Sequence, residues 1–318
     1  MSDSPYVFSV ALDGEGGADA IDPDRSPSPH GSWLHLDATS VQAHAILEAQ
    51  GIEPFIAEIM TRVESRPHAE KAGQGILIIL RGINRNAGAD PEDMVSIRIW
   101  LARDRMVSAR LRPIRAAQTI LGQLEEGRGP DCMTQLALGV IEKLADGIAE
   151  FVDDIEARMD GFEDRIEKDS STSVRREISA LRRQLAAVRR YLAPQRDALE
   201  PLCRLGGDLF DTEEIFALRE QAHRITRYVE DLDLVRERAL VAQEELMNHI
   251  AQQQNARTYL FSVVATIFLP ITFISGVFGM NTAGLPGLEH PHAFWLVAGL
   301  MATISGLVIV WLRRKRWF

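Results

Sequence analysis

The stretch Thr258–Met280, TYLFSVVATIFLPITFISGVFGM, decides the architecture of this chain, because it contains no Asp, Glu, Lys or Arg. A second uncharged stretch, AFWLVAGLMATISGLVIVWL, follows at Ala293–Leu312. A helix rises about 1.5 Å per residue, so each stretch is long enough to cross a hydrocarbon core of about 30 Å. The sequence therefore predicts two transmembrane helices, at residues 257–280 and 293–312.

The charges beside the two stretches predict their orientation in the membrane. Arg257 precedes the first stretch, and a basic tail at residues 313–318 follows the second. The loop between them, at residues 281–292, has no Lys or Arg. Because positively charged flanks stay on the cytoplasmic side, both termini are expected in the cytoplasm and the loop outside. Met1–Ala11 lacks the basic and apolar regions of a signal peptide, so the first span is expected to direct insertion.

Composition describes a protein whose bulk is soluble and whose membrane signal is local. The hydrophobic share of 46% is ordinary for a globular chain, so the apolar stretches stand out against it. Cys132 and Cys203 are the only cysteines, which argues against a disulfide framework and fits a reducing compartment. The formal net charge of -10 makes nucleic acid a poor partner and a cation a plausible one.

The N-terminal part of the chain is predicted to contain a small α/β domain. Much of the segment 1–31 is rich in Gly, Asp, Ser and Pro, and we expect this segment to be flexible. The domain itself is expected at residues 32–130. Within it, the apolar run Gly75–Arg81 predicts a buried strand, and Met94–Trp100 with Arg105–Leu111 predicts a hairpin.

Residues 131–256 are expected to form long helices. Asp211 begins a helical pattern, and Glu214 completes a capping-box signature with it. Apolar residues then step by three and four positions, as in a coiled-coil seam: Leu218, Ala222, Ile225, Val229, Leu232, Val235, Ala239, Ala242 and Leu246. No Pro or Gly interrupts this pattern before Arg257, so one helix is predicted to run from the cytosol into the membrane.

Two of the predicted helices carry opposite charge. Acids crowd the helix expected at Met133–Glu167, and arginines crowd the helix expected at Val174–Leu199. One interpretation is that the two helices lie antiparallel and pair through complementary surfaces. Another is that the surplus acids concentrate divalent cations near a pore mouth. The sequence leaves both interpretations open.

A stripe of small and polar residues follows the first span at steps of three and four, which places it on one helix face: Asn255, Thr258, Ser262, Ala265, Leu269, Thr272 and Gly276. An unpartnered hydroxyl or amide is costly in hydrocarbon, so this face should meet protein or water. Small residues also mark tight helix contacts, which is the alternative interpretation. The stripe has no carboxylate, His or Cys, so a passing divalent ion would keep much of its water shell. Leu269 is a candidate apolar gate.

Candidate metal ligands are sparse. Zinc prefers His, Cys and carboxylate ligands, yet no two histidines have convincing ligand spacing on one helix face. The candidates near the spans are His249 on the inner side and Glu289, His290 and His292 in the outer loop. His290 and His292, at the expected entrance, are the better candidates for weak capture of a metal ion.

Gly279-Met280-Asn281 closes the first span, and two C-terminal spans, a basic tail and a long preceding helix accompany it. This combination resembles the CorA superfamily of divalent-cation transporters. Further stretches are similar to the zinc-transporter (ZntB-like) branch: LRGIN at Leu80–Asn84, GADPEDMVSIRIW at Gly88–Trp100 and NTAGLPG at Asn281–Gly287. The likeness covers nearly the whole chain, from about Trp33 onward.

The resemblance implies a funnel-shaped homopentamer in a bacterial-type inner (plasma) membrane. Each protomer would have an α+β cytosolic domain, long helices and two transmembrane helices. The first span would line a central pore, with Gly279 and Met280 near its outer mouth and Asn281 forming a ring that meets the hydrated ion. The family's pore positions correspond to residues on the stripe described above: Asn255, Thr258, Leu269, Thr272 and Gly276.

The resemblance also implies Zn²⁺ as the transported substrate, with H⁺ as a candidate coupling ion and no tightly bound cofactor. The candidate proton carriers near the spans are His249, Glu244 and Glu245 on the inner side and Glu289, His290 and His292 on the outer side. Phe278 stands where the magnesium channels commonly have Tyr, and Ala283 replaces a Gly usual in the zinc-type loop. A Mg²⁺, Co²⁺ or Ni²⁺ channel gated by cytosolic Mg²⁺ is the alternative.

A membrane-anchored sensor or scaffold is a different class of function, but an anchor needs no aligned polar stripe. Enzyme activity lacks support, since the chain has no Gly-x-Ser-x-Gly, phosphate-binding Gly-Lys-Ser/Thr or His-Glu-x-x-His motif.

Overall fold

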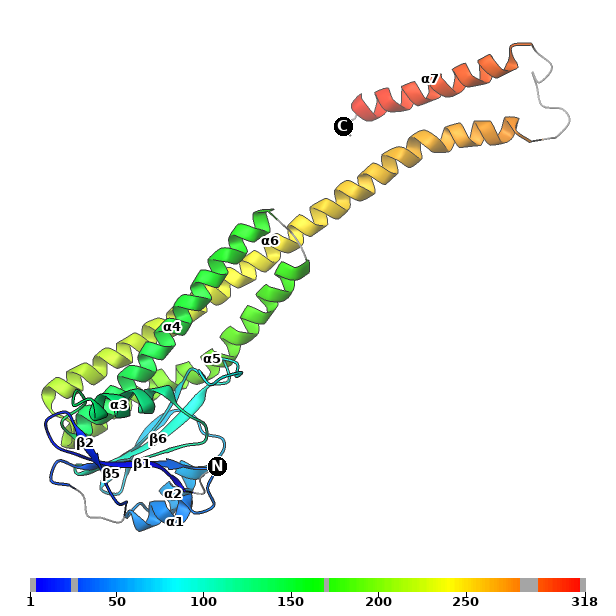
Figure 1. Ribbon diagram of the computed structural model, residues 1–318. Coiled ribbons are helices and arrows are strands. Elements are labelled where there is room, and N and C mark those ends of the chain that lie inside the picture. The colour runs from blue at the N-terminus through cyan, green and yellow to red at the C-terminus, as the bar shows by residue number, and fades with distance from the viewer. Residues whose placement is uncertain (1–3, 24–27, 169–171, 281–290, 315–318) are drawn as a thin grey trace. The chain divides into compact units, whose positions relative to one another are not determined.

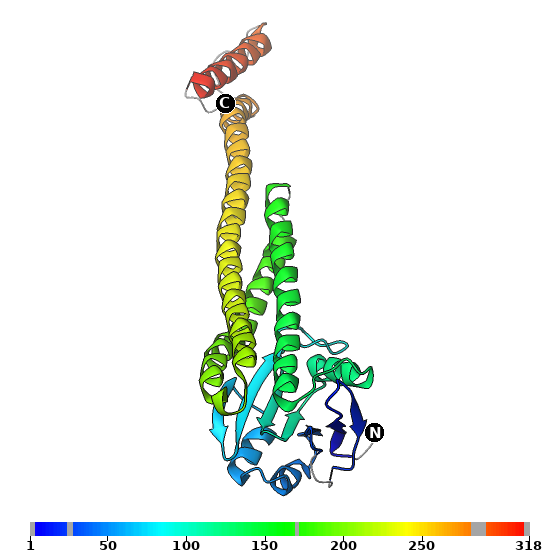
Figure 2. The ribbon, with the colours of Figure 1, turned by 90° about the vertical axis from the view of Figure 1, so that its left-hand side faces the viewer.

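The computed structural model describes residues 4–23, 28–168, 172–280 and 291–314 (Figure 1). Its contacts group into two units, Met1–Gln243 and Glu244–Phe318, called here the N-terminal and C-terminal units. The N-terminal unit combines a β-sheet with long helices, and the C-terminal unit is helical where it is described (Figure 2). The longest helix, α6 (Thr212–Phe278), belongs to both units.

A seven-stranded sheet forms the base of the N-terminal unit, in the order β2-β1-β3-β7-β6-β5-β4. Only the β3–β7 pair is parallel among the described strands, and the other neighbours are antiparallel. The strands are β1 (Tyr6–Leu12), β2 (Ala18–Ala20), β3 (Ser32–Asp37), β4 (His68–Ala72), β5 (Gly75–Gly82), β6 (Val95–Leu101) and β7 (Arg105–Arg110).

The centre of the sheet is buried on both faces. Every residue of β5 and β6 is buried, which confirms the predicted buried strand, and β6 pairs with β7 as the predicted hairpin. Helices α1 (Ala43–Ala49) and α2 (Pro54–Thr61) cover one face through a cluster that includes Leu47, Met60 and Ile79. Helices α3 (Arg115–Glu125) and α4 (Met133–Lys168) lie on the other side of the sheet (Figure 1).

The expectation that residues 1–31 form a flexible segment is wrong for β1 and β2, which belong to the sheet. Strand β1 pairs with both β2 and β3, and Leu12 is 2% exposed. The ring of Phe8 meets the ring of Trp33 edge-on, with their centroids 4.6 Å apart. The glycines and acids that suggested disorder belong to the turn after β1, where Gly14 and Gly16 have φ of 83° and 90°. A glycine adopts this left-handed backbone without steric cost.

Helix α5 (Thr172–Leu205) continues beyond the predicted end at Leu199 and contains Pro194 and Pro201. Each proline removes one backbone hydrogen bond from a helix. Packing offsets this loss, because Leu199 and Leu202 are 1% and 0% exposed on the buried side of the helix. A short 3₁₀ turn, η1 (Gly206–Asp208), then leads toward α6.

The start of α6 has the predicted capping box. The Glu214 N–H donates to Asp211 Oδ1 at 2.8 Å, and the Asp211 N–H donates to Glu214 Oε2 at 2.9 Å. These bonds satisfy two donors that a helix start leaves open. The other Glu214 oxygen accepts a hydrogen bond from the Thr134 hydroxyl at 2.7 Å, which ties the start of α6 to the start of α4.

Ion pairs join α6 to both neighbouring helices of the N-terminal unit. Acids of α4 pair with arginines of α6: Asp146 with Arg224, and Asp160 and Glu163 with Arg238. Arg189 of α5 pairs with Asp233 of α6 at 2.5 Å. Acids of α4 and Arg189 of α5 thus pair with residues of α6, a partner that neither sequence interpretation included. Helices α4 and α5 also pair with each other, through Arg165 and Glu177 at 2.7 Å.

Candidate ion pathway along the apolar part of α6

The C-terminal unit contains both apolar stretches, as the end of α6 and as α7 (Ala293–Arg314). Each helix contains an 18-residue window with a mean hydropathy of 2.2, and at most 6% of either window is buried. Such large exposed apolar surfaces require lipid or protein around them. Length and composition therefore make both helices candidates for membrane spans.

One side of the apolar part of α6 is covered within this unit, and that side carries bulky residues. Val263 is 4% exposed, and residues stepping by three and four from it are half-buried: Ile267, Ile271, Ile274 and Phe278. At about 100° per residue, these positions lie roughly opposite the stripe of small and polar residues. The bulky side of the helix is thus its least exposed side.

The stripe itself is exposed along its whole length. Every one of its residues is open in the isolated chain: Asn255, Thr258, Ser262, Ala265, Leu269, Thr272 and Gly276. Leu269 has 70% of its surface accessible. A polar face left open within one chain is available to water or to other copies of the chain.

The hydroxyl groups near the stripe are arranged to accept hydrogen bonds. Ser262 donates to the Thr258 carbonyl at 2.9 Å, and Thr266 donates to the Ser262 carbonyl at 2.7 Å. Each hydroxyl donates its hydrogen bond to a backbone carbonyl, so the lone pairs of the hydroxyl oxygen remain free to accept hydrogen bonds. Water molecules around a cation present their hydrogens outward, and such oxygens can accept those hydrogens.

The end of α6 depends on a glycine. The Gly279 N–H donates to the Ser275 carbonyl at 2.9 Å. A Cβ atom on residue 279 would lie 2.9 Å from that carbonyl oxygen, which is too close for a side chain. Met280 follows with half of its surface exposed. Asn281, the candidate ring residue, lies outside the described residues.

The described residues bring no metal-ligand cluster together. No group of three His, Cys, Asp or Glu residues suited to a metal ion occurs within residues 4–23, 28–168, 172–280 and 291–314. The side chain of His249 is 41% exposed and lies 4.0 Å from Glu245, one helical turn away. His292 is exposed just before α7, whereas Glu289 and His290 lie outside the described residues. Weak metal capture by the outer histidines stays a prediction.

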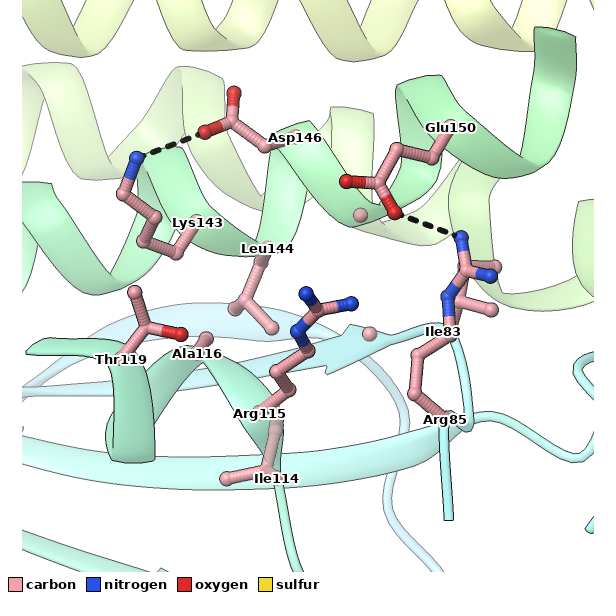
Figure 3. A pocket seen from close by; sticks show the side chains of 12 residues that line it. Ile83, Arg85, Ile114, Arg115, Ala116, Thr119, Lys143, Leu144, Asp146 and Glu150 are labelled. Carbon is pink, nitrogen blue, oxygen red and sulfur yellow. Dashed lines mark hydrogen bonds and ion pairs between the residues drawn. The ribbon is translucent and has the colours of Figure 1, made fainter. Parts of the chain in front are cut away.

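The pocket between α3 and α4 has a mixture of charges that largely neutralise one another (Figure 3). Its acids are both paired, Glu150 with Arg85 at 3.0 Å and Asp146 with Lys143 at 3.0 Å. Burial raises the pKa of Asp146, but hydrogen bonds from Arg224 and Lys143 outweigh this effect and lower it. The ion pairs of this pocket, which has a volume of about 200 Å³, therefore hold neighbouring elements together, and the pocket is not a cation site.

A family model described as "CorA-like Mg²⁺ transporter protein" matches residues 29–314, which include both apolar helices. The chain belongs to the CorA family of divalent cation transporters. It is a membrane protein with two transmembrane helices, α7 and the apolar end of α6, and it is a transporter rather than an enzyme.

Relatives of this CorA-family chain extend over its full length. It is 34% identical over 325 residues to the divalent cation transporter CmaX of Pseudomonas aeruginosa, a match covering 98% of this chain and 96% of CmaX. It is equally 34% identical over 322 residues to the zinc transport protein ZntB of Pectobacterium atrosepticum, covering 100% and 97%. The structure of full-length CmaX superimposes with a TM-score of 0.85 at 32% identity, covering 98% of each chain.

Sequence reasoning overlooked two arginines of this CorA-family chain. Arg81 and Arg98 belong to the stretches LRGIN and GADPEDMVSIRIW. These stretches contributed a similarity to a family, and the two arginines were not predicted to be buried charges. Both are buried, on the adjacent strands β5 and β6. A charged residue within an otherwise apolar strand is the signal that could have found them, because burying a charge is costly.

Proposed function

We propose that this chain transports Zn²⁺ into the cytoplasm, coupled to H⁺, through a central pore lined by α6. The observation that supports this most is the exposed polar stripe on the side of α6 opposite its covered side. A span that served only as an anchor could be apolar on every side. A pore assembled from several copies would place such a stripe around its axis.

A homopentamer is the assembly we propose for that pore. One helix cannot enclose an ion pathway, so several copies must contribute their stripes. Leu269, exposed in the isolated chain, would form an apolar ring that closes the pathway by excluding water. Asn281 would form a ring at the outer mouth, three residues after the end of α6 at Phe278.

The ion would pass largely hydrated under this proposal. The stripe presents hydroxyl and amide groups without a carboxylate, His or Cys, so it cannot replace the inner ligands of a zinc ion with charged groups. Accepting hydrogen bonds from the ion's water shell requires only oxygen lone pairs, such as that of Ser262. Conduction benefits from such modest binding at several places, since tight binding would stop release.

The relatives support two choices of metal. ZntB is named a zinc transport protein, and CmaX, equally similar, is named a divalent cation transporter. The alternative is a Mg²⁺, Co²⁺ or Ni²⁺ channel closed by cytosolic Mg²⁺ at acids on the helices. One observation favours it: burial, with Asp231 and Asp153 nearby, raises the pKa of Glu156, and a divalent cation there would relieve the repulsion.

Flux into liposomes that contain the purified protein tests the proposal. The external solution holds either Zn²⁺ or Mg²⁺, with the outside either at the internal pH or more acidic. We expect Zn²⁺ entry that accelerates when the outside is more acidic, accompanied by H⁺ entry. Mg²⁺ entry whose rate does not depend on the pH gradient, and which Mg²⁺ inside the liposomes blocks, would instead support the Mg²⁺, Co²⁺ or Ni²⁺ channel.

A further inference from the structure

Arg81 on β5 and Arg98 on β6 place two buried positive charges side by side in the sheet. Arg98 is opposite Ile79 in the β5–β6 register, so it lies diagonally from Arg81 on the same face. Arg81 is 8% exposed and Arg98 is 0% exposed. Removing a guanidinium from water is costly unless an anion or a full set of acceptors replaces the water.

Backbone carbonyl groups accept hydrogen bonds from only some of the N–H groups of these two arginines. Arg81 donates to the Met94 carbonyl at 3.1 Å and to the Ser65 carbonyl at 2.7 Å. Arg98 donates to the Arg62 carbonyl at 2.6 Å. In this cluster, four buried polar atoms have no hydrogen-bond partner among the described residues: Nε of Arg81, Nε and Nη1 of Arg98, and Oγ of Ser65.

No acid neutralises this cluster in the described part of the chain. Arg81 and Arg98 form no ion pair there, nor do their neighbours Arg66 and Arg190. Asp93, whose charge reaches Arg81, is itself engaged by Arg112 through two hydrogen bonds. Burial, and then the charge of Arg81, lower the pKa of Arg98 to about 10. Arg98 therefore remains a cation at neutral pH.

A cavity of about 340 Å³ opens beside Arg81. Helix α5 supplies one wall, held in place because the Arg81 backbone N–H donates to the buried Gln195 side chain at 2.6 Å. The Arg81 guanidinium lies 3.9 Å from the ring centroid of Tyr191, and the Arg190 guanidinium lies 4.7 Å from it. The lining residues are Glu64, Ser65, Arg66, Arg81, Arg190 and Tyr191.

We propose that this cavity binds the phosphate group of inorganic phosphate or of a small phosphate monoester. Guanidinium groups match phosphate oxygens in geometry and charge. Three of them line this cavity, and none of the three forms an ion pair within the described residues. Arg66 and Arg190 are exposed at the mouth, and the unpartnered Arg81 Nε and Ser65 Oγ lie deeper. Arg98 adds positive charge behind Arg81. Glu64, exposed at the rim, is outweighed by the three arginines of the lining.

This site goes beyond ion transport and does not depend on the proposed pore. It lies wholly within the N-terminal unit and uses Arg81 and Arg98 of the two stretches that the ion pathway leaves without a role. The cavity also exceeds the size of a phosphate ion and approaches that of small-molecule pockets. It has room for a compact organic group beyond the phosphate.

Equilibrium dialysis of the purified full-length protein against radiolabelled inorganic phosphate tests the site. We expect saturable binding of one phosphate per protomer that survives an excess of chloride. Competition with glycerol 3-phosphate distinguishes the two sources: stronger displacement than by unlabelled phosphate assigns the site to a monoester, and weaker displacement assigns it to the free ion. Absence of saturable binding of either probe at millimolar concentration would overturn the proposal.

Variants separate this site from general charge attraction. Arg66→Ala combined with Arg190→Ala should weaken phosphate binding by at least about tenfold, because charge-assisted hydrogen bonds are lost. Arg183→Ala removes an exposed arginine from the same helix, two turns from Arg190, and should leave binding unchanged. Both variants alter exposed side chains, so circular dichroism should show the native helix content. Equal affinity in both variants, or equal displacement by chloride, would contradict the proposal.

Discussion

Arg238 of α6 donates hydrogen bonds to both carboxylate oxygens of Glu163 on α4, at 3.0 and 2.6 Å. The same guanidinium donates to Asp160 one turn away, at 2.5 Å. These bonds raise the pKa of Arg238 well above its ordinary value. The contact matters beyond its energy, because α6 is the helix that continues into the membrane.

Replacing Arg238 by Ala should destabilise the N-terminal unit by about 1 kcal/mol, the upper end for partly exposed ion pairs. Thermal unfolding of the full-length protein followed by circular dichroism measures the change. Arg236→Ala is the matched control, because Arg236 lies on the same helix and approaches Asp233 only to 3.9 Å. An equal loss in both variants would mean that the contact to α4 contributes nothing specific.

His35 should make the folded state sensitive to acid. It is completely buried with Nδ1 2.7 Å from Ser108 Oγ, and burial lowers its pKa from 6.5 to about 3. The unfolded chain takes up a proton below about pH 6.5, whereas the folded chain does not until about pH 3. Stability is therefore present above pH 6.5 and is lost as the pH falls, by about 2 kcal/mol between pH 6.5 and 5.

Denaturant unfolding at pH 7 and pH 5 checks the role of His35. The His35→Gln variant should lose part of this pH dependence, even if its stability at pH 7 is lower. His68→Gln changes a histidine that is about 39% exposed and should keep the wild-type pH dependence. If wild-type and His35→Gln proteins lose the same stability on acidification, other groups account for it.

Two of the three threonines of the first span, Thr272 and Thr266, allow a direct test of the stripe. Thr272 lies on the exposed polar stripe, while Thr266 lies off it with its hydroxyl donated to the Ser262 carbonyl. Thr272→Val keeps the side-chain shape but removes an acceptor for the ion's water shell. We expect it to slow metal flux in liposomes several-fold, whereas Thr266→Val should transport normally. The reverse ranking would place the pathway on another face of the helix.

Gly279→Ala should impair transport without preventing membrane insertion. Its Cβ would lie 2.9 Å from the Ser275 carbonyl oxygen, so the helix end must shift and the residues after it must move. Gly299→Ala in α7 is the control, because a Cβ there meets nothing within 4 Å. Metal flux in liposomes, with insertion checked by flotation, measures both. Normal flux in Gly279→Ala would show that the shape of this helix end is unimportant.

Asn281→Ala tests the outer ring more directly. The amide can hydrogen-bond to the water shell of an ion, and Ala cannot, so we expect metal uptake to fall severely while insertion is unchanged. Thr282→Ala removes a neighbouring polar group and should have a smaller effect. Wild-type uptake in the Asn281→Ala protein would remove Asn281 from the pathway.

Local sequence patterns were sufficient wherever a residue's environment depends on near neighbours in the chain. The uncharged stretches predicted both spans, and Asp211 with Glu214 predicted a capping box whose two hydrogen bonds are present. The apolar run at Gly75–Arg81 likewise predicted a strand that is wholly buried. Length, apolarity and three-residue spacing can all be read directly from the sequence.

Tertiary structure decided what depends on residues far apart in sequence. The sequence did not predict β1, because the Gly- and Asp-rich residues that follow this strand suggested a flexible segment. Strand β1 is ordered by pairing with β3, which comes after a turn and a second strand in the chain. The acids of α4 meet Arg224 and Arg238 because α6 packs beside them, which charge counting along each helix could not reveal.

The buried arginine pair and the covered side of α6 illustrate the same limit. The sequence by itself determined that this chain spans a membrane twice and that one span carries a polar stripe, because both follow from composition and helical period. Only the folded chain determined that Arg81 and Arg98 lie together without an ion pair among the described residues and that the stripe stays exposed. Burial and charge pairing are properties of neighbours in space, and the fold brings those neighbours together.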